Sequence, residues 1–230
     1  MNKTMTFLRA VSRMSREVFQ RDMLSLAQQQ AAAAPVGDAM VVNLVRLSFA
    51  DLPYRPPSDP TAGQTPEYDV IIESWSRRPA VEMARGLQAL LRQSASVVHT
   101  FAVTPTVIYD RGGFTRGWPS AGIKLIGRLM FHADMPDGAV RRSWGLHAAL
   151  AARVHVGSAV YVQNWVDAAL GHDCPATRGI PVMHFGSEQD FFERFVDSPR
   201  GMEEVIQDTS HFVAGGPRFY TTEYSMGEAP

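Results

Sequence analysis

The order of apolar and polar positions is repeated in the two halves of the chain. Residues 6–30 and 127–151 each begin with a short apolar run typical of a strand, turn around a methionine, and continue as a long helical pattern. A second strand, a loop, a third strand, a second helix and a fourth strand then follow in both halves. The predicted strands are 39–47, 69–75, 98–109, 158–166, 180–186 and 217–224, the loops 51–67 and 171–179, and the second helices about 77–94 and 187–209. Each half therefore predicts the order β-α-β-β-α-β.

This order is that of the ferredoxin-like unit, whose four-stranded antiparallel sheet has both helices on one face. The bare face must be covered, and a second copy of the unit can cover it. We predict an α+β fold in which two ferredoxin-like halves pack sheet to sheet as an α+β barrel with the helices outside. The first half takes residues 1–110, a linker takes 111–122, and the second half takes 123–230.

Composition narrows the class of protein. The 230 residues are 45% hydrophobic and 20% charged, which is a balance typical of globular proteins. The net charge of −1 gives no reason to expect a nucleic acid or an anionic membrane as a partner. No apolar run is long enough for a signal peptide or a membrane span, so we expect a soluble, cytoplasmic protein.

Common cofactor and metal motifs are absent from the sequence. The single cysteine, Cys174, excludes an internal disulfide and a multi-cysteine metal site. There is no G-x-G-x-x-G after a strand, no P-loop, no H-E-x-x-H and no G-x-S-x-G. We therefore expect no bound cofactor and no metal.

Strand alternation gives the first candidate site residues. In the strand that opens the second half, Leu125, Leu129 and Phe131 form the apolar set expected to face the helices. Arg128 and His132 alternate with that set, so they are predicted to point into the barrel.

The second strand of the same half, 158–166, gives a further set. Its valines suit the helix side, so Tyr161, Gln163 and Trp165 are predicted to point inward. In the first half, the predicted inward set is Met5, Phe7, Arg9, Asn43 and Ser74. Six of the seven histidines follow residue 131, which favours one working pocket in the second half.

Four stretches of the second half also form a pattern that can be compared with known families. They are KLIGRLMFH, RRSWGLHAALAARV with Trp144 and His147 three residues apart, AVYVQNWV, and RGIPVMHFGSEQDFFERFVDSPRG. Together they resemble the EthD family of the dimeric α+β barrel superfamily, over residues 123–224. The family usually has a proline shortly after the histidine, where this chain reads HAAL. The first half has Met23 and Leu26 at the matching positions and is interpreted as a diverged copy that serves as scaffold.

The resemblance implies a fold more firmly than an activity, because the superfamily includes monooxygenases, polyketide cyclases, lactone isomerases, decarboxylases, dehydratases and haem-handling enzymes. It favours the face of Ile180, Val182 and His184 as interior. On this fold Trp144 would fill the helix–sheet interface, and His147 would reach the edge of the pocket. Because many superfamily members associate further, the resemblance also implies a homodimer.

Imidazoles, a phenol and an arginine within aromatic walls suit general acid–base chemistry on a small aromatic or enolisable molecule. We predict a cofactor-independent lyase for a phenolic substrate, which acts by retro-aldol type carbon–carbon cleavage, decarboxylation or dehydration. Its predicted catalytic residues are His147, His184 and Tyr161. The predicted substrate-binding residues are Arg9, Asn43, Arg128, His132, Gln163, Trp165 and His211. The alternatives are a monooxygenase or polyketide cyclase on the same fold, or a non-catalytic small-molecule-binding or stress-response barrel.

Overall fold

Eight strands close into one antiparallel barrel in a computed structural model, which describes residues 1–46 and 66–226. The order around the barrel is β1-β3-β2-β10-β5-β8-β7-β4. The strands are β1 (Asn2–Ala10), β2 (Ala39–Val45), β3 (Val70–Ser76), β4 (Ala95–Asp110), β5 (Ile123–Gly127), β7 (Ser158–Ala169), β8 (Gly179–Phe185) and β10 (Arg218–Met226). The predicted α+β barrel is thus confirmed, whereas most of the predicted loop 51–67 lies outside the described residues.

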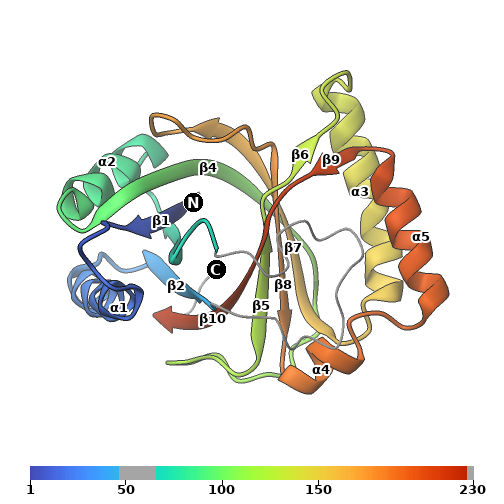
Figure 1. Ribbon diagram of the computed structural model, residues 1–230, viewed down its shortest axis with the longest axis horizontal. Helices are drawn as coiled ribbons and strands as arrows, with labels where there is room; N and C mark the ends of the chain where they lie inside the picture. Colours follow the sequence, from blue (N-terminus) through green and yellow to red (C-terminus); the bar gives the residue numbers. More distant parts are fainter. Residues whose placement is uncertain (47–65, 227–230) are drawn as a thin grey trace.

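The helices lie outside the barrel in two groups (Figure 1). The described helices are α1 (Arg16–Ala33), α2 (Ala80–Leu91), α3 (Asp137–Val154), α4 (Glu188–Glu193) and α5 (Pro199–Ser210). The first two contact strands of the first half and β10, and α3 packs beside α5 on the second half. A separate two-stranded ladder joins β6 (Met130–Phe131) to β9 (Val213–Gly215). No helix in the described ranges is long and apolar enough to cross a membrane.

Two predicted elements are interrupted. The helix predicted at 187–209 is wrong as one element, because α4 ends at Glu193 and α5 begins at Pro199. Proline restricts the residue before it to extended backbone, and Ser198 caps the new helix by accepting from the Gly201 N–H at 3.0 Å. The opening strand of the second half likewise stops at Gly127, ahead of the short β6.

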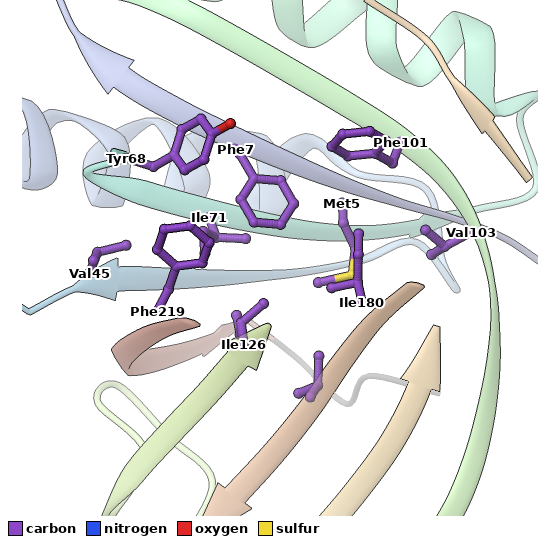
Figure 2. Packing of buried hydrophobic residues seen from close by; sticks show 11 residues of the cluster. Met5, Phe7, Val45, Tyr68, Ile71, Phe101, Val103, Ile126, Ile180 and Phe219 are labelled. Carbon is purple, nitrogen blue, oxygen red and sulfur yellow. The ribbon is translucent and has the colours of Figure 1, made fainter. Parts of the chain in front are cut away.

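Apolar side chains fill the middle of the barrel. Phe7 lies 5.2 Å from Tyr68, 5.9 Å from Phe101 and 5.8 Å from Phe219, measured between ring centroids. Figure 2 shows these rings converging with aliphatic side chains from strands of both halves. Met5 belongs to the same cluster, so the predicted inward orientation of Met5 and Phe7 is confirmed.

A cluster of buried charges lies inside the barrel toward the start of β1 and β5. The Glu73 carboxylate contacts the ammonium groups of Lys3, at 2.8 Å, and Lys124. Lys124 also contacts Glu223 at 2.7 Å, and Asn164 accepts from Lys3 at 2.9 Å. Because both ends of each ion pair are buried, removal of one partner would leave an uncompensated buried charge.

Candidate functional site

A cavity of about 400 Å³ lies between the outer face of the second-half sheet and helices α3 and α5. Its walls are mostly apolar, and its polar members come from the helices and from β7 and β10. The lining includes Leu125, Gly127, Trp144, His147, His155, Tyr161, Met183, Phe195, Met202, Phe212 and Arg218. Small-molecule sites in proteins have this size and this mixture of apolar walls with few polar groups.

His147 is held at the cavity wall by a carboxylate on the neighbouring helix. Its Nδ1 lies 2.7 Å from Oδ2 of Asp208, and only 6% of His147 is exposed. A carboxylate accepts from Nδ1–H, so Nε2 is left as the nitrogen that can take a proton. Burial lowers the pKa of His147 even though Asp208 acts to raise it. The histidine is therefore a neutral, oriented base near pH 7.

Tyr161 lines the same cavity from β7. Gln163 donates from Nε2 to the Tyr161 hydroxyl at 3.1 Å and to the Trp144 carbonyl at 2.8 Å, which ties the strand to α3. Burial raises the pKa of Tyr161 to about 12. The phenol thus stays protonated and can donate its own hydrogen to a bound molecule.

Trp144 anchors α3 to the sheet. Its ring lies 5.6 Å from Phe131 and 6.4 Å from Trp165, measured between centroids. An alanine Cβ at Gly179 would lie 2.7 Å from the Trp144 ring, so this glycine makes room for the indole. The expectation that Trp144 fills the helix–sheet interface is confirmed, and the one-turn spacing then places His147 over the sheet.

The inward orientation predicted for β7 is wrong. Tyr161, Gln163 and Trp165 lie on the outer face, under α3, whereas Val162 and Asn164 point into the barrel. Both faces of this strand are buried, so the valines do not mark the helix side. The prediction assumed that the barrel held the pocket, but apolar side chains and buried ion pairs fill the barrel, and the cavity that Tyr161 lines is on the outer face.

Two candidates, His184 and Asn43, do lie inside the barrel, and Arg128 is buried just past the end of β5. His184 donates from Nε2 to the Ala121 carbonyl at 2.7 Å and stacks on Phe114 at 3.9 Å. Arg128 contacts Glu67 at 3.1 Å and Thr177 at 3.3 Å, and Asn43 donates to the carboxylate of Glu73 at 3.2 Å. The sheet separates these side chains from His147 and Tyr161, so the predicted convergence of all candidates on one pocket is wrong.

Other candidates lie away from the cavity. His132 bonds through Nε2 to the Ser210 carbonyl at 2.9 Å, and His211 is exposed just after α5. Arg9 is exposed at the end of β1, and Ser74 faces the helices rather than the interior. For His132 the reason is that the strand ends at Gly127, so the alternation cannot be extended to residue 132.

Sequence reasoning missed Asp208 and Arg218. Asp208 could not be paired with His147 without knowing that α5 packs on α3. Phe219 faces the barrel core, and neighbouring residues of a strand point to opposite faces. The sequence therefore could have predicted that Arg218 points toward the helices. Among the described residues, no group of three or more His, Cys, Asp or Glu side chains could hold a metal ion.

Comparisons with known proteins return structures alone, since no family model and no curated protein matches the chain. An anthrone oxidase-like protein matches at 11% identity and a TM-score of 0.58, over 99% of this chain and 93% of its own. A protein of Fusobacterium nucleatum subsp. nucleatum named as a monooxygenase matches at 6% identity and 0.58, over 96% and 91%. A mutant chlorite dismutase from Candidatus Nitrospira defluvii matches at 11% identity and 0.53, over 98% and 91%. At these identities the likeness shows the ferredoxin-like α+β barrel fold alone, and the EthD family remains a prediction.

Proposed function

We propose that this protein is an enzyme that removes a proton from a phenolic or enolisable small molecule in the second-half cavity. The observation that supports this most is the pair of His147 and Asp208 at the cavity wall. A histidine held through Nδ1 by a carboxylate presents Nε2 as a base of fixed orientation. The lowered pKa of His147, caused by burial, keeps this base unprotonated at neutral pH.

Tyr161 supplies the hydrogen bond that the product of proton removal needs. Enolate and phenolate oxygens are stabilised by a donor that is already in place before the charge develops. The Tyr161 hydroxyl accepts from Gln163, which orients its proton, and burial keeps the phenol neutral with a pKa of about 12.

The reaction that we propose is of the lyase type. In a retro-aldol cleavage, His147 takes the proton of the substrate hydroxyl, the adjacent carbon–carbon bond breaks, and its electron pair forms an enolate whose oxygen accepts from Tyr161. The aldehyde leaves, and the proton returns from His147 to the enolate carbon. No oxidant and no cofactor are consumed. Decarboxylation or dehydration would use the same two side chains in the same roles.

A second candidate is a cofactor-independent monooxygenase that uses the same base. Two structural neighbours are named as anthrone oxidase-like and as a monooxygenase, and the apolar walls of this cavity would shield a substrate carbanion from water. In that reaction a deprotonated methylene carbon reacts with O₂ and becomes a carbonyl, and the second oxygen atom leaves as water.

The first half serves as scaffold in this proposal, and each half is a ferredoxin-like unit. The order β4-β1-β3-β2 in the first half matches β10-β5-β8-β7 in the second. Lys3 and Lys124 also stand near the start of the first strand of each half and share Glu73. We also propose that the protein is cytoplasmic and that it forms a homodimer.

Hydrogen–deuterium exchange at carbon tests whether His147 moves a proton to and from an enolate carbon, which is the last step of the retro-aldol cleavage and the first step of the oxygenation. The protein is incubated in D₂O with naphthols, anthrones and aromatic β-hydroxyketones, and NMR follows exchange and products. His147→Gln should lose about 10²- to 10⁴-fold in exchange rate. His211→Gln is the matched control, because His211 is exposed and outside the cavity lining, and it should retain the full rate.

The products distinguish the two candidates. A lyase releases an aldehyde without oxygen uptake, whereas a monooxygenase consumes one O₂ per carbonyl formed. Exchange in His147→Gln as fast as in the wild-type protein, or none in the wild-type protein, would refute the proposal.

A further inference from the structure

We infer that the molecule bound in this cavity is an aromatic carboxylate and that Arg218 binds its carboxylate group. The inference rests on the proposed function only in taking the second-half cavity as the ligand site. It makes no use of His147 as a base, so it can be tested separately.

The position of Arg218 follows from the strand that carries it. Arg218 opens β10 and pairs with Gly127 of β5. Phe219 next to it packs in the barrel core, so alternation turns Arg218 to the outer face, where it lines the cavity. Gly127 has no side chain to cover the cavity at this point, and Arg218 is only half-buried.

Arg218 differs from the other described arginines that are not exposed. Each of those four has a carboxylate partner. They are Arg16 with Asp69, Arg46 with Glu188, Arg128 with Glu67 and Arg178 with Asp137. In the part of the chain that the structure describes, Arg218 has neither a carboxylate nor a hydrogen-bond acceptor. A half-buried guanidinium without a protein acceptor keeps its donors available to water or to the acceptor that a ligand supplies.

The remaining lining leaves this charge uncompensated. Burial lowers the pKa of His147 and brings that of His155 to about 4, so neither histidine is charged at pH 7. Tyr161 is neutral for the reason given above, and Asp208 at the cavity edge is bound to His147. Within the described lining, the cavity therefore presents one formal charge, and it is positive.

The charge and the walls together define the ligand. The walls are leucine, methionine, phenylalanine and tryptophan, which suit an aromatic body of one or two rings in about 400 Å³. A carboxylate carries one charge and matches the planar fork of a single arginine by two parallel hydrogen bonds. A phosphate monoester would bring a second charge and a third oxygen, for which this lining has no second cation.

The test compares two probes of the same shape by isothermal titration calorimetry. The first is 2-naphthoate, and the second is 2-naphthamide, which replaces the carboxylate by a neutral amide. The wild-type protein should bind 2-naphthoate at least tenfold more tightly than 2-naphthamide. Arg218→Gln should bind both equally, and Arg218→Lys should keep part of the preference because it retains the charge without the fork.

Arg142→Gln is the matched control, since Arg142 is an exposed residue of α3 and its loss changes the net charge equally. It should keep the full preference, which separates local binding from long-range attraction.

A preference retained in Arg218→Gln, or no naphthoate binding by the wild-type protein, overturns the inference. Loss of exchange activity in His147→Gln with naphthoate binding intact leaves both proposals standing. Intact exchange in that variant refutes the base but leaves the carboxylate site standing.

Discussion

Replacing Glu73 by glutamine should lower the free energy of unfolding by about 3 to 5 kcal/mol, because it leaves a buried ammonium without its partner. Glu73 is 2% exposed and contacts Lys3 and Lys124. Burial alone would raise the pKa of Glu73, but Lys124 and Lys3 outweigh it and lower the pKa from 4.5 to about 2. Each pKa unit corresponds to about 1.4 kcal/mol, so ionised Glu73 contributes about 3 kcal/mol at pH 7.

The pH dependence has a definite sign. A carboxyl group whose pKa is lower in the folded state contributes stability above the unfolded pKa, and the contribution is lost as the pH falls through the folded pKa. The difference between the wild-type protein and Glu73→Gln should therefore be complete above about pH 4.5 and should shrink toward pH 2.

Urea-induced unfolding followed by circular dichroism measures both quantities. Glu203→Gln on the exposed face of α5 is the control and should change the free energy by less than about 0.5 kcal/mol. A double variant, Glu73→Gln with Lys3→Met, removes one charge of each sign, leaves the pair of Lys124 and Glu223 intact, and should recover part of the loss. If Glu73→Gln costs less than about 1 kcal/mol at pH 7, the charge cluster does not stabilise the barrel and the reasoning is refuted.

The remaining predictions concern other sites. Burial lowers the pKa of His155 to about 4, so stability should fall by about 3 kcal/mol as the pH falls from 6.5 to 4, and urea unfolding of His155→Gln should show a flatter dependence. Asp208→Asn should shift the acid limb of the proton-exchange rate to lower pH, since Asp208 raises the pKa of His147, and should slow exchange by at least about 100-fold. Gly122→Ala should cost about 2 kcal/mol or more, read as a lower melting temperature, because φ is +85° and its Cβ would lie 1.9 Å from a backbone carbonyl oxygen. Gly86→Ala, in open space on α2, should instead be neutral or stabilising.

The barrel could be predicted because its signals are local and repeated. Eight apolar runs, each bounded by turn residues and ordered identically in both halves, specify strands and helices before any contact is known. The break of the last helix also had a sequence signal, since Ser198 before Pro199 is a helix start.

The position of the site could be predicted only in part. The histidine three residues after Trp144 led to α3, and His147 does line a cavity in the second half. The sequence could not show which residues of β7 face the barrel interior and which face the helices. The strand is buried on both faces and carries apolar residues on each. Asp208 becomes visible only once two helices far apart in the sequence pack together.

The second-half sheet divides the molecule into two compartments, with the ion pairs of Lys124 and Glu223 on its inner face and His147 and Tyr161 over its outer face. Substitutions in the outer cavity therefore leave the contacts that close the barrel unchanged, and substitutions at separated sites without shared partners tend to act additively. Such a division favours evolvability. A descendant chain could exchange the residues proposed as base, donor and anion-binding arginine, and so change its substrate, while it keeps the ion pairs inside the barrel.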